Sequence, residues 1–218
     1  KSKGNVVNPL EIIEEFGADT LRLFTLFIGD YEQATPWNPN GVKGARRFLD
    51  KLSRLEEKVT EEENKAYQVI LHKTIKAVGE DIEAVKFNTA IAKLMTLVNE
   101  LQKVNHVNKA DYEVLLKLVY PFAPHICEEL WETLGHKEDM VFESWPVYDE
   151  SRLVESTIEL AVSINGKVRD KISIDINMSK EEILELARTC EKIQTQLVGK
   201  TIVKEIYVPN KLINIVVK

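Results

Sequence analysis

The chain has 218 residues, of which 44% are hydrophobic and 29% are charged, and its formal net charge is −6. This length favours two domains, each able to bury a core, and no apolar run is long enough to span a bilayer, so the composition excludes membrane insertion. The acidity argues against a DNA-coating or other non-specific nucleic-acid-binding protein, because such binding depends on clustered Lys and Arg.

Two short helices are predicted near the start of the chain. Asn8 and Pro9, with Glu11 three residues after the Asn, form an N-cap, a first-turn proline and a capping-box acid. Gly17 suits the left-handed conformation that ends a helix. Asp19 is then predicted to cap a second, largely buried helix that ends at Gly29.

Four amphipathic stripes follow, with apolar residues at three- and four-residue intervals. Such a succession is typical of an antiparallel helical bundle. Pro121 and Pro124 interrupt the last helix, which restarts and ends at Gly135. The stripes consist of Val42, Ala45, Phe48, Leu49, Leu52, Leu55 and Val59; Tyr67, Ile70, Leu71, Ile75, Val78 and Ile82; Ile91, Leu94, Met95, Val98 and Leu101; and Tyr112, Leu115, Leu116 and Val119.

The hydrophobic period changes to two after Trp145 and Pro146, with alternating apolar residues from Ile158 to Ile164. Asn165-Gly166 is a strong hairpin signal, because both residues tolerate positive φ. Ser179 and Glu182 form a capping box for one helix, and two β-rich segments close the chain. The sequence therefore predicts a multi-domain chain of α and α+β class, a helical bundle followed by a small ββαββ domain.

The C-terminal segment is the basic part of an acidic chain. Residues 157–218 contain ten Lys and Arg against eight Asp and Glu, a net charge of +2, which leaves −8 for the residues before them. Strand alternation predicts that Lys167, Arg169 and Lys171 share one face, opposite Val168 and Ile172. Such a face suits RNA phosphates. The alternative is a solvated strand whose lysines prevent edge-to-edge aggregation.

No catalytic set can be assembled from the residues alone. His72, His106, His125 and His136 lack metal-ligand spacing, and no phosphate-binding glycine loop or hydrolase motif is present. We interpret His125 and Cys127 as packing residues and predict no metal site. Two distant cysteines fit a reducing cytoplasm. The absence of a signal-like segment and of an initiator Met suggests a piece of a longer protein.

The opening residues and several later motifs resemble the class I aminoacyl-tRNA synthetases. Lys1 and Ser2 match the last two positions of the mobile KMSKS loop, whose first three positions are missing, as is the HIGH motif of the nucleotide-binding fold. The later motifs are similar to the bacterial leucyl type along essentially the whole chain. They are Gly17-Ala18-Asp19-Thr20-Leu21-Arg22, Ala34-Thr35-Pro36-Trp37-Asn38, Gly41-Val42-Lys43-Gly44-Ala45-Arg46-Arg47-Phe48-Leu49, Phe87-Asn88-Thr89-Ala90, Pro121-Phe122-Ala123-Pro124-His125, Glu128-Glu129-Leu130-Trp131 and Val162-Ser163-Ile164-Asn165-Gly166-Lys167-Val168-Arg169.

The resemblance implies three segments: the end of the KMSKS loop with a stem-contact segment (1–40), a bundle of the anticodon-binding type (41–150) and a tRNA-binding C-terminal domain (157–218). It implies that the parent enzyme uses ATP and Mg²⁺ to attach leucine to tRNA(Leu), with Lys1 contacting ATP or pyrophosphate and Ser2 beside it. It also implies that Lys167, Arg169 and Lys171 contact the tRNA elbow. Since most of the ATP site is missing, we expect the chain alone to be inactive.

Two functional hypotheses remain open from the sequence. In the first, the chain is a tRNA-binding part of a leucyl-type synthetase that also packs against the catalytic domain of the same enzyme. In the second, it is a protein-interaction module whose acidic bundle docks the catalytic portion, and the basic hairpin binds little tRNA. Phosphate contacts would make tRNA affinity fall with salt concentration, so a salt titration distinguishes the two.

Overall fold

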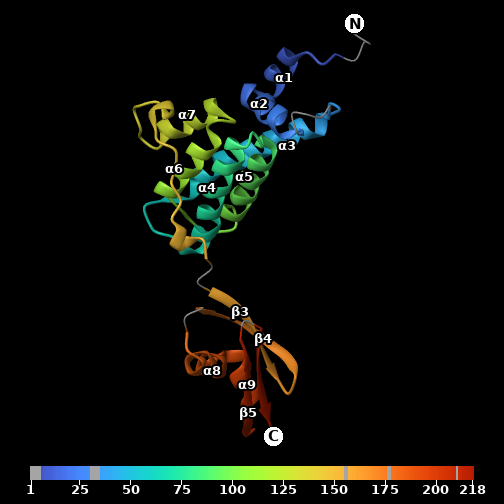
Figure 1. The fold of residues 1–218 in the computed structure, drawn as a ribbon, viewed down its shortest axis with the longest axis vertical. Helices are drawn as coiled ribbons and strands as arrows, with labels where there is room; N and C mark the ends of the chain where they lie inside the picture. Colours follow the sequence, from blue (N-terminus) through green and yellow to red (C-terminus); the bar gives the residue numbers. More distant parts are fainter. Residues whose placement is uncertain (1–5, 30–34, 155–156, 176–177, 210) are drawn as a thin grey trace. The chain divides into compact units, whose positions relative to one another are not determined.

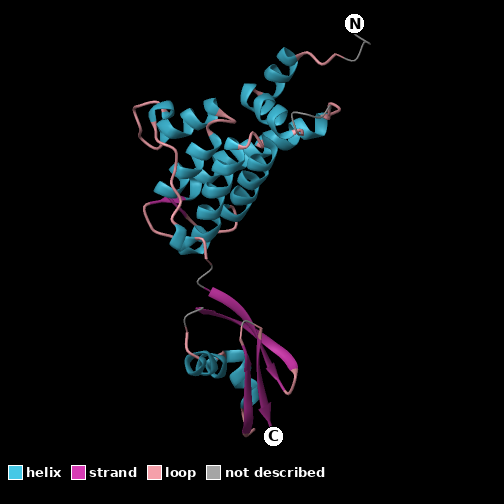
Figure 2. Cartoon of the chain, viewed as in Figure 1, coloured by secondary structure: helices cyan, strands magenta, loops and turns pink. Residues whose placement is uncertain are grey.

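The computed structural model describes residues 6–29, 35–154, 157–175, 178–209 and 211–218. The chain divides into two compact units, Lys1–Leu153 and Val154–Lys218, which we call the helical unit and the sheet unit (Figure 1). Helices make up most of the first, and the second contains a four-stranded sheet with helices beside it (Figure 2). The chain is therefore of mixed α and β class.

Helices α1 (Pro9–Phe16) and α2 (Ala18–Phe27) begin the described helical unit. Asn8 Oδ1 accepts a hydrogen bond from the Leu10 amide at 3.1 Å, and Gly17 has a φ of +88°, so the predicted cap and stop are confirmed. The prediction that Asp19 caps α2 is wrong. Gly17 is the N-cap of α2, and the Asp19 carboxylate points to another helix, as described below.

Five further α-helices follow in the described part of this unit: α3 (Pro39–Arg54), α4 (Gln68–Glu83), α5 (Phe87–Leu101), α6 (Lys109–Val119) and α7 (Pro124–Thr133). The predicted first stripe extends to Val59, whereas α3 ends earlier. Lys58 Nζ donates to the carbonyls of Gln102 and Val104, at 2.7 and 2.9 Å, and this contact with the end of α5 fixes a different local conformation. The chain there forms a 3₁₀ turn (Leu55–Lys58) and strand β1 (Val59–Thr60), which pairs in parallel with β2 (Val107–Asn108).

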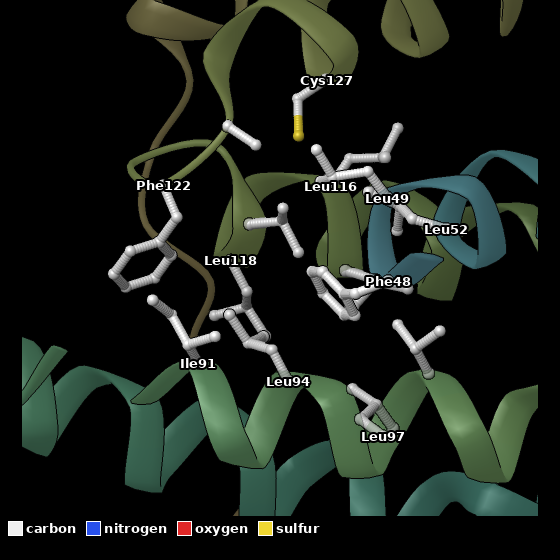
Figure 3. Close-up of a cluster of buried hydrophobic side chains, with 14 of the residues drawn as sticks. Phe48, Leu49, Leu52, Ile91, Leu94, Leu97, Leu116, Leu118, Phe122 and Cys127 are labelled. Carbon is white, nitrogen blue, oxygen red and sulfur yellow. The ribbon is translucent and has the colours of Figure 1, made fainter. Parts of the chain in front are cut away.

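The apolar stripes meet in one core. Figure 3 shows Phe48 and Leu52 of α3 facing Leu94 and Leu97 of α5, with Leu116 of α6 nearby. All five side chains are buried, and Leu23 and Phe24 of α2 belong to the same cluster. Burial of a large aliphatic or aromatic side chain contributes roughly 1.5–3 kcal/mol, so this shared core is the main stabilising contribution to the helical unit.

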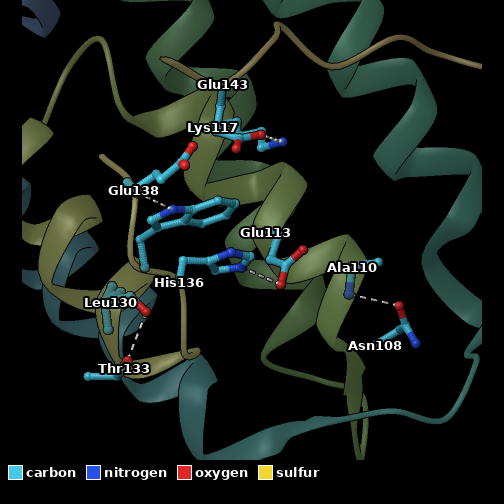
Figure 4. A network of polar contacts seen from close by, with 10 residues as sticks. Asn108, Ala110, Glu113, Lys117, Leu130, Thr133, His136, Glu138 and Glu143 are labelled. Carbon is cyan, nitrogen blue, oxygen red and sulfur yellow. Dashed lines mark hydrogen bonds and ion pairs between the residues drawn. The ribbon is translucent and has the colours of Figure 1, made fainter. Parts of the chain in front are cut away.

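Polar contacts fasten the segment after α7 onto α6. His136 Nε2 lies 2.8 Å from Glu113 Oε1, and its ring stacks on Trp131 with centroids 3.6 Å apart. The Trp131 indole donates to the carbonyl of Glu138 at 3.1 Å. Lys117 and Glu143 form an ion pair at 2.7 Å, also visible in Figure 4. These contacts hold a segment that contains only the 3₁₀ turns Met140–Phe142 and Glu150–Arg152.

The sheet unit contains β3 (Thr157–Ile164), β4 (Lys167–Asp175), α8 (Lys180–Thr189), α9 (Glu191–Leu197), β5 (Ile202–Val208) and β6 (Leu212–Val217). The strand order is β4-β3-β6-β5, with β3 and β6 parallel and the other pairs antiparallel. Ile183 of α8 and Ile193 of α9 are buried in one cluster with Leu160, Val162 and Ile213 of the strands. The two helices therefore cover one face of the sheet.

The helical region of the sheet unit differs from the sequence expectation. The Ser179–Glu182 capping box is present in full, as predicted. However, one helix was expected, and Cys190 adopts an extended conformation (φ −62°, ψ 123°) that separates α8 from α9. The break lets Ile193 of the second helix join Ile183 in the core. In the part of the chain that the structure describes, no helix has both the length and the hydropathy to cross a membrane.

Candidate nucleic-acid interface

The β3–β4 hairpin carries the basic residues singled out by the sequence, and its turn is held in place from a third strand. Asn165 (φ +48°) and Gly166 (φ +79°) form the turn, both in the left-handed region. Asn165 Nδ2 donates to the Val217 carbonyl at 3.1 Å, and Oδ1 accepts from the Val217 amide at 2.9 Å. Asn214 Oδ1 accepts from the Gly166 amide at 2.9 Å. The hairpin tip is therefore bound to β6.

A β-bulge at Arg169 changes which residues share a face. Val162 pairs with Asp170 and Ser163 pairs with Val168, so Arg169 has no partner residue in β3. Because directly opposed residues project from the same side of a sheet, Lys167 shares the face of Ile164, and Lys171 shares the face of Ala161. These two positions of β3 lie on opposite faces.

The expectation that Lys167, Arg169 and Lys171 lie together on one face, opposite Val168, is therefore wrong. The extra residue of the bulge reverses the alternation between Lys171 and Lys167. All three side chains remain exposed at an edge strand. A strand pattern with no turn signal inside it gives no warning of a bulge at this position.

The three cations also differ in whether a nearby carboxylate forms an ion pair with them. Lys171 Nζ lies 3.0 Å from Glu159 Oε2, across the hairpin, and both side chains are largely exposed. Lys167 and Arg169 form no ion pair with any residue in the described ranges. The hairpin therefore presents two uncompensated cations beside its anchored turn and a third that shares its charge with a carboxylate.

Asp170, next to the bulge, connects β4 to α9. Its carboxylate accepts hydrogen bonds from the Cys190 thiol and from Lys192 Nζ, both at 3.0 Å. The hydrogen bond from the Cys190 thiol and, to a lesser extent, that from Lys192 lower the pKa of Asp170 to about 2. The contact was not predicted from the sequence, because Cys190 and Lys192 lie 20 and 22 residues further along the chain.

A buried carboxylate joins α2 to α7. Asp19 is 7% exposed, and its Oδ2 accepts from the Ile126 amide at 2.7 Å in the first turn of α7. Its Oδ1 lies 2.7 Å from His125 Nδ1. Arg22 adds bonds from Nε and Nη2 to the Pro121 carbonyl at 3.2 and 2.9 Å. Asp19 therefore satisfies the N-terminus of α7 instead of that of α2.

The environments of His125 and Cys127 differ from each other. His125 has an exposed ring beside Asp19, whereas Cys127 is fully buried in the helical core, where burial raises the pKa of its thiol.

Lys1 and Ser2, the residues predicted to contact ATP, lie outside the described residues. Trp37 packs edge-to-face on Phe24, with ring centroids 4.9 Å apart.

Comparison with known proteins gives a consistent result. The chain is 48% identical, over its whole length, to a leucine–tRNA ligase of Alkaliphilus oremlandii, and spans 27% of that protein. Its fold matches the Agrobacterium radiobacter K84 agnB2 LeuRS in a ternary complex described as LeuRS-tRNA-LeuAMS. The TM-score is 0.65 and the identity 31%, covering 100% of this chain and 31% of that one.

A family model described as the anticodon-binding domain of tRNA ligase matches residues 64–184. This range runs from the turn before α4 through α7 and the β3–β4 hairpin to the start of α8. It covers more than half of the 218 residues. The chain therefore belongs to the family of anticodon-binding domains of tRNA ligases.

Proposed function

We propose that this chain is the tRNA-binding part of a leucine–tRNA ligase and that it does not catalyse the reaction by itself. The observation that carries the proposal is the 48% identity to a leucine–tRNA ligase along the entire chain. The 31% identity to a LeuRS solved with tRNA supports the same assignment. The cations of the anchored β3–β4 hairpin supply the chemistry that such binding requires.

In the proposed parent enzyme, ATP activates leucine in the presence of Mg²⁺, and the leucyl group then passes to tRNA(Leu). Lys1 is proposed to contact ATP or pyrophosphate, with Ser2 beside it. We assign no step of this chemistry to the described residues. We also propose that the chain packs against the catalytic domain of the same enzyme and that it works in the cytoplasm.

The division of labour within the chain follows the same proposal. Residues 1–40 would join the ATP-binding loop to the bundle, residues 41–150 would form an antiparallel bundle of the anticodon-binding type, and residues 157–218 would bind tRNA. The bonds from Asp19 and Arg22 to the α7 region support a firm connection between the first two segments. The bundle would recognise tRNA shape more than individual bases.

The hairpin is the proposed contact with the tRNA elbow. Its tip is bound to β6 through Asn165, so Lys167 and Arg169 are presented on a support with little freedom to move. A pre-organised cation loses less conformational entropy on binding than a flexible one. Lys171 is the weaker candidate of the three, because Glu159 already shares its charge.

A second candidate function is docking of a protein partner by the helical unit. The observation that favours it is the concentration of acidic residues around α7, where Glu128, Glu129 and Glu132 line one surface hollow with Glu138 and Asp139. A basic surface of the catalytic portion would complement this charge. Under this alternative the purified chain binds tRNA weakly or not at all.

The test of the proposed function combines two measurements on the purified chain. The first is equilibrium binding of a tRNA(Leu) transcript, which we expect to be tight enough to measure. The second is ATP–pyrophosphate exchange with leucine, which we expect to be absent. Lack of tRNA binding at low salt would contradict the proposal and favour the docking alternative, and measurable exchange would contradict the assignment of catalysis to other parts of the enzyme.

A further inference from the structure

The segment that ends the helical unit runs antiparallel to α4, along one side of that helix. We call residues 145–152 the strap. Four residues of α4, spaced three or four apart and therefore on one side of the helix, lie beside it. From the start of α4 to its end, the pairs are Gln68 with Arg152, His72 with Asp149, Lys76 with Tyr148 and Gly79 with Trp145.

The pair of His72 and Asp149 is a hydrogen bond in which the imidazole accepts. The backbone amide of Asp149 donates to His72 Nδ1 at 3.0 Å. Nδ1 can accept this bond only when it carries no proton, so the ring in this contact is neutral. A protonated ring would direct an N–H at the N–H of Asp149, and the bond would be lost.

The neighbouring pairs hold the strap through other kinds of contact. Arg152 Nη1 donates to Gln68 Oε1 at 2.8 Å, and Gln68 Nε2 donates to Asp111 of α6 at 2.6 Å. Lys76 Nζ lies 5.3 Å from the centre of the Tyr148 ring. Among the side chains of the four pairs, the imidazole is the group whose ordinary pKa lies between 5 and 8.

Packing against Gly79 holds the far end of the strap. A Cβ added to Gly79 would lie 3.4 Å from Nε1 of Trp145, so the glycine lets the indole lie close to α4. Tyr148 is half-buried and packs against the helical core. Residues 145–148 therefore have attachments that do not depend on His72.

The charges that act on His72 come from the strap and from α6. Burial, and then the positive charge of Arg152, lower the pKa of His72 below its ordinary value of 6.5, against the opposite influence of Asp149 and Asp111. Lys76 adds a positive charge one turn further along α4. Because the pKa is lowered in the folded chain, the contact contributes stability above about pH 6.5, and this contribution is lost as the pH falls below it.

We propose that His72 is a proton-sensitive clasp, which holds the strap on α4 at neutral pH and releases residues 149–152 when its ring is protonated. The sheet unit begins at Val154, two residues after the strap, and β3 begins at Thr157. Release lengthens the connection between the attached part of the strap and β3 by four residues. Four extended residues span up to about 14 Å.

The clasp makes the reach of the sheet unit depend on pH. A longer connection lowers the effective concentration of one binding unit near a ligand that the other unit holds. This inference goes beyond the proposed function and does not rest on it, because the clasp is a contact within the helical unit and its test requires no tRNA.

The test measures hydrogen exchange of the Asp149 amide by NMR, in the full 218-residue chain at pH 7.5 and at pH 5.5. Protection is the intrinsic exchange rate at each pH divided by the measured rate. His72→Asn replaces the ring by an amide that does not titrate, and His72→Ala removes the acceptor. His106→Asn is the matched control, since His106 is also half-buried but has no part in the strap contacts. The amides of α5 and circular dichroism report on global unfolding.

We expect protection of the Asp149 amide in the natural chain to fall threefold or more between pH 7.5 and 5.5. The fall should not exceed about tenfold, because a group with an ordinary pKa of 6.5 that is released at pH 5.5 supplies no larger factor. The His106→Asn variant should behave in the same way. His72→Asn should abolish the pH dependence, and His72→Ala should have low protection at both pH values.

A pH-independent protection of Asp149 in the natural chain would overturn the proposal. So would an equal fall in the natural chain and in His72→Asn, because another group would then be responsible. Small-angle X-ray scattering tests the lengthened connection: on acidification the radius of gyration of the natural chain should increase more than that of His72→Asn. If the two radii change equally while the exchange result holds, the clasp stands and the longer reach is refuted.

Discussion

The side chain of Asn165 pairs with the backbone of Val217 as a neighbouring strand residue would, donating from Nδ2 and accepting at Oδ1. Asn165 belongs to the hairpin turn, and Val217 ends the last strand. This pairing extends the parallel β3–β6 ladder beyond Ile164 and links the proposed RNA-binding hairpin to the far end of the chain.

Replacing Asn165 should loosen the hairpin in two separable ways. Asn165→Gly removes the two hydrogen bonds but keeps the positive φ, and should destabilise the sheet unit by about 1–2 kcal/mol. Asn165→Ala adds the strain of a left-handed alanine, roughly 1 kcal/mol more. Hydrogen exchange of the β6 amides measures both losses of stability. Tryptophan fluorescence is unsuitable, because Trp37, Trp131 and Trp145 all lie in the helical unit and do not report on the sheet unit. Equal protection in all three proteins would contradict the anchoring role.

Two glycines of α3 should respond in opposite directions to alanine. A Cβ on Gly41 would lie 2.5 Å from Cε2 of the buried Phe24, so Gly41→Ala should destabilise the helical unit by about 1–3 kcal/mol. A Cβ on Gly44 would approach only the end of Arg47, at 3.9 Å. Gly44→Ala should therefore stabilise it by up to about 1 kcal/mol. Urea unfolding followed by tryptophan fluorescence tests the pair, and a matching sign for both changes would count against this packing.

Removing the Asp19 carboxylate should weaken the connection between α2 and α7. Asp19→Ala leaves the buried Ile126 amide without its acceptor, at a cost of about 1–3 kcal/mol. Asp19→Asn keeps an acceptor oxygen and should cost less. The exposed Glu15→Ala is the control. Tryptophan fluorescence during urea unfolding is a suitable measurement, because Trp131 lies in α7; an Asp19→Ala variant as stable as the control would refute the role.

Acid should selectively weaken the contact between β4 and α9. The pKa of Asp170 is about 2 in the folded chain, against an ordinary value of 3.8 for an aspartate carboxyl. A lowered folded pKa contributes stability above the unfolded value, and this contribution is lost as pH falls from about 4 to 2. Hydrogen exchange of the α9 amides across this range measures the loss. Asp170→Asn should flatten the profile, and an unaltered profile would show that other groups cause it.

The hairpin cations should contribute unequally to tRNA binding. Lys167→Gln combined with Arg169→Gln should weaken affinity roughly tenfold at low salt and make the salt dependence shallower by about two. Lys171→Gln should weaken tRNA affinity less than Lys167→Gln alone or Arg169→Gln alone, since Lys171 is paired with Glu159. Glu159→Gln is the reciprocal test and should strengthen binding slightly. If Lys171→Gln proves the most damaging of the three, the arrangement of the hairpin charges proposed above is wrong.

Local signals in the sequence predicted much of the secondary structure. The cap at Asn8, the stop at Gly17, the Asn165-Gly166 turn and the Ser179–Glu182 box all depend on residues close together in the chain. The apolar stripes identified the core, and Tyr112, Leu115 and Leu116 are fully buried. These features were predictable because caps, turns and helix faces are determined by short-range geometry and periodicity.

The errors concern contacts between residues far apart in sequence. Asp19 has the form of a local cap, but it bonds to Ile126, which is 107 residues away. The bulge at Arg169 arises in the pairing of β4 with β3 and places Lys167 on the face opposite to Lys171, although the two were predicted to share one face.

The most direct test of the central claim is the salt dependence of tRNA(Leu) binding by the purified chain. If the chain holds folded RNA through phosphate contacts of Lys167, Arg169 and Lys171 on the hairpin, log affinity falls linearly with log salt, with a slope of about −2 to −3. Undetectable binding at 50 mM salt, or an affinity that does not change up to 300 mM, would contradict it.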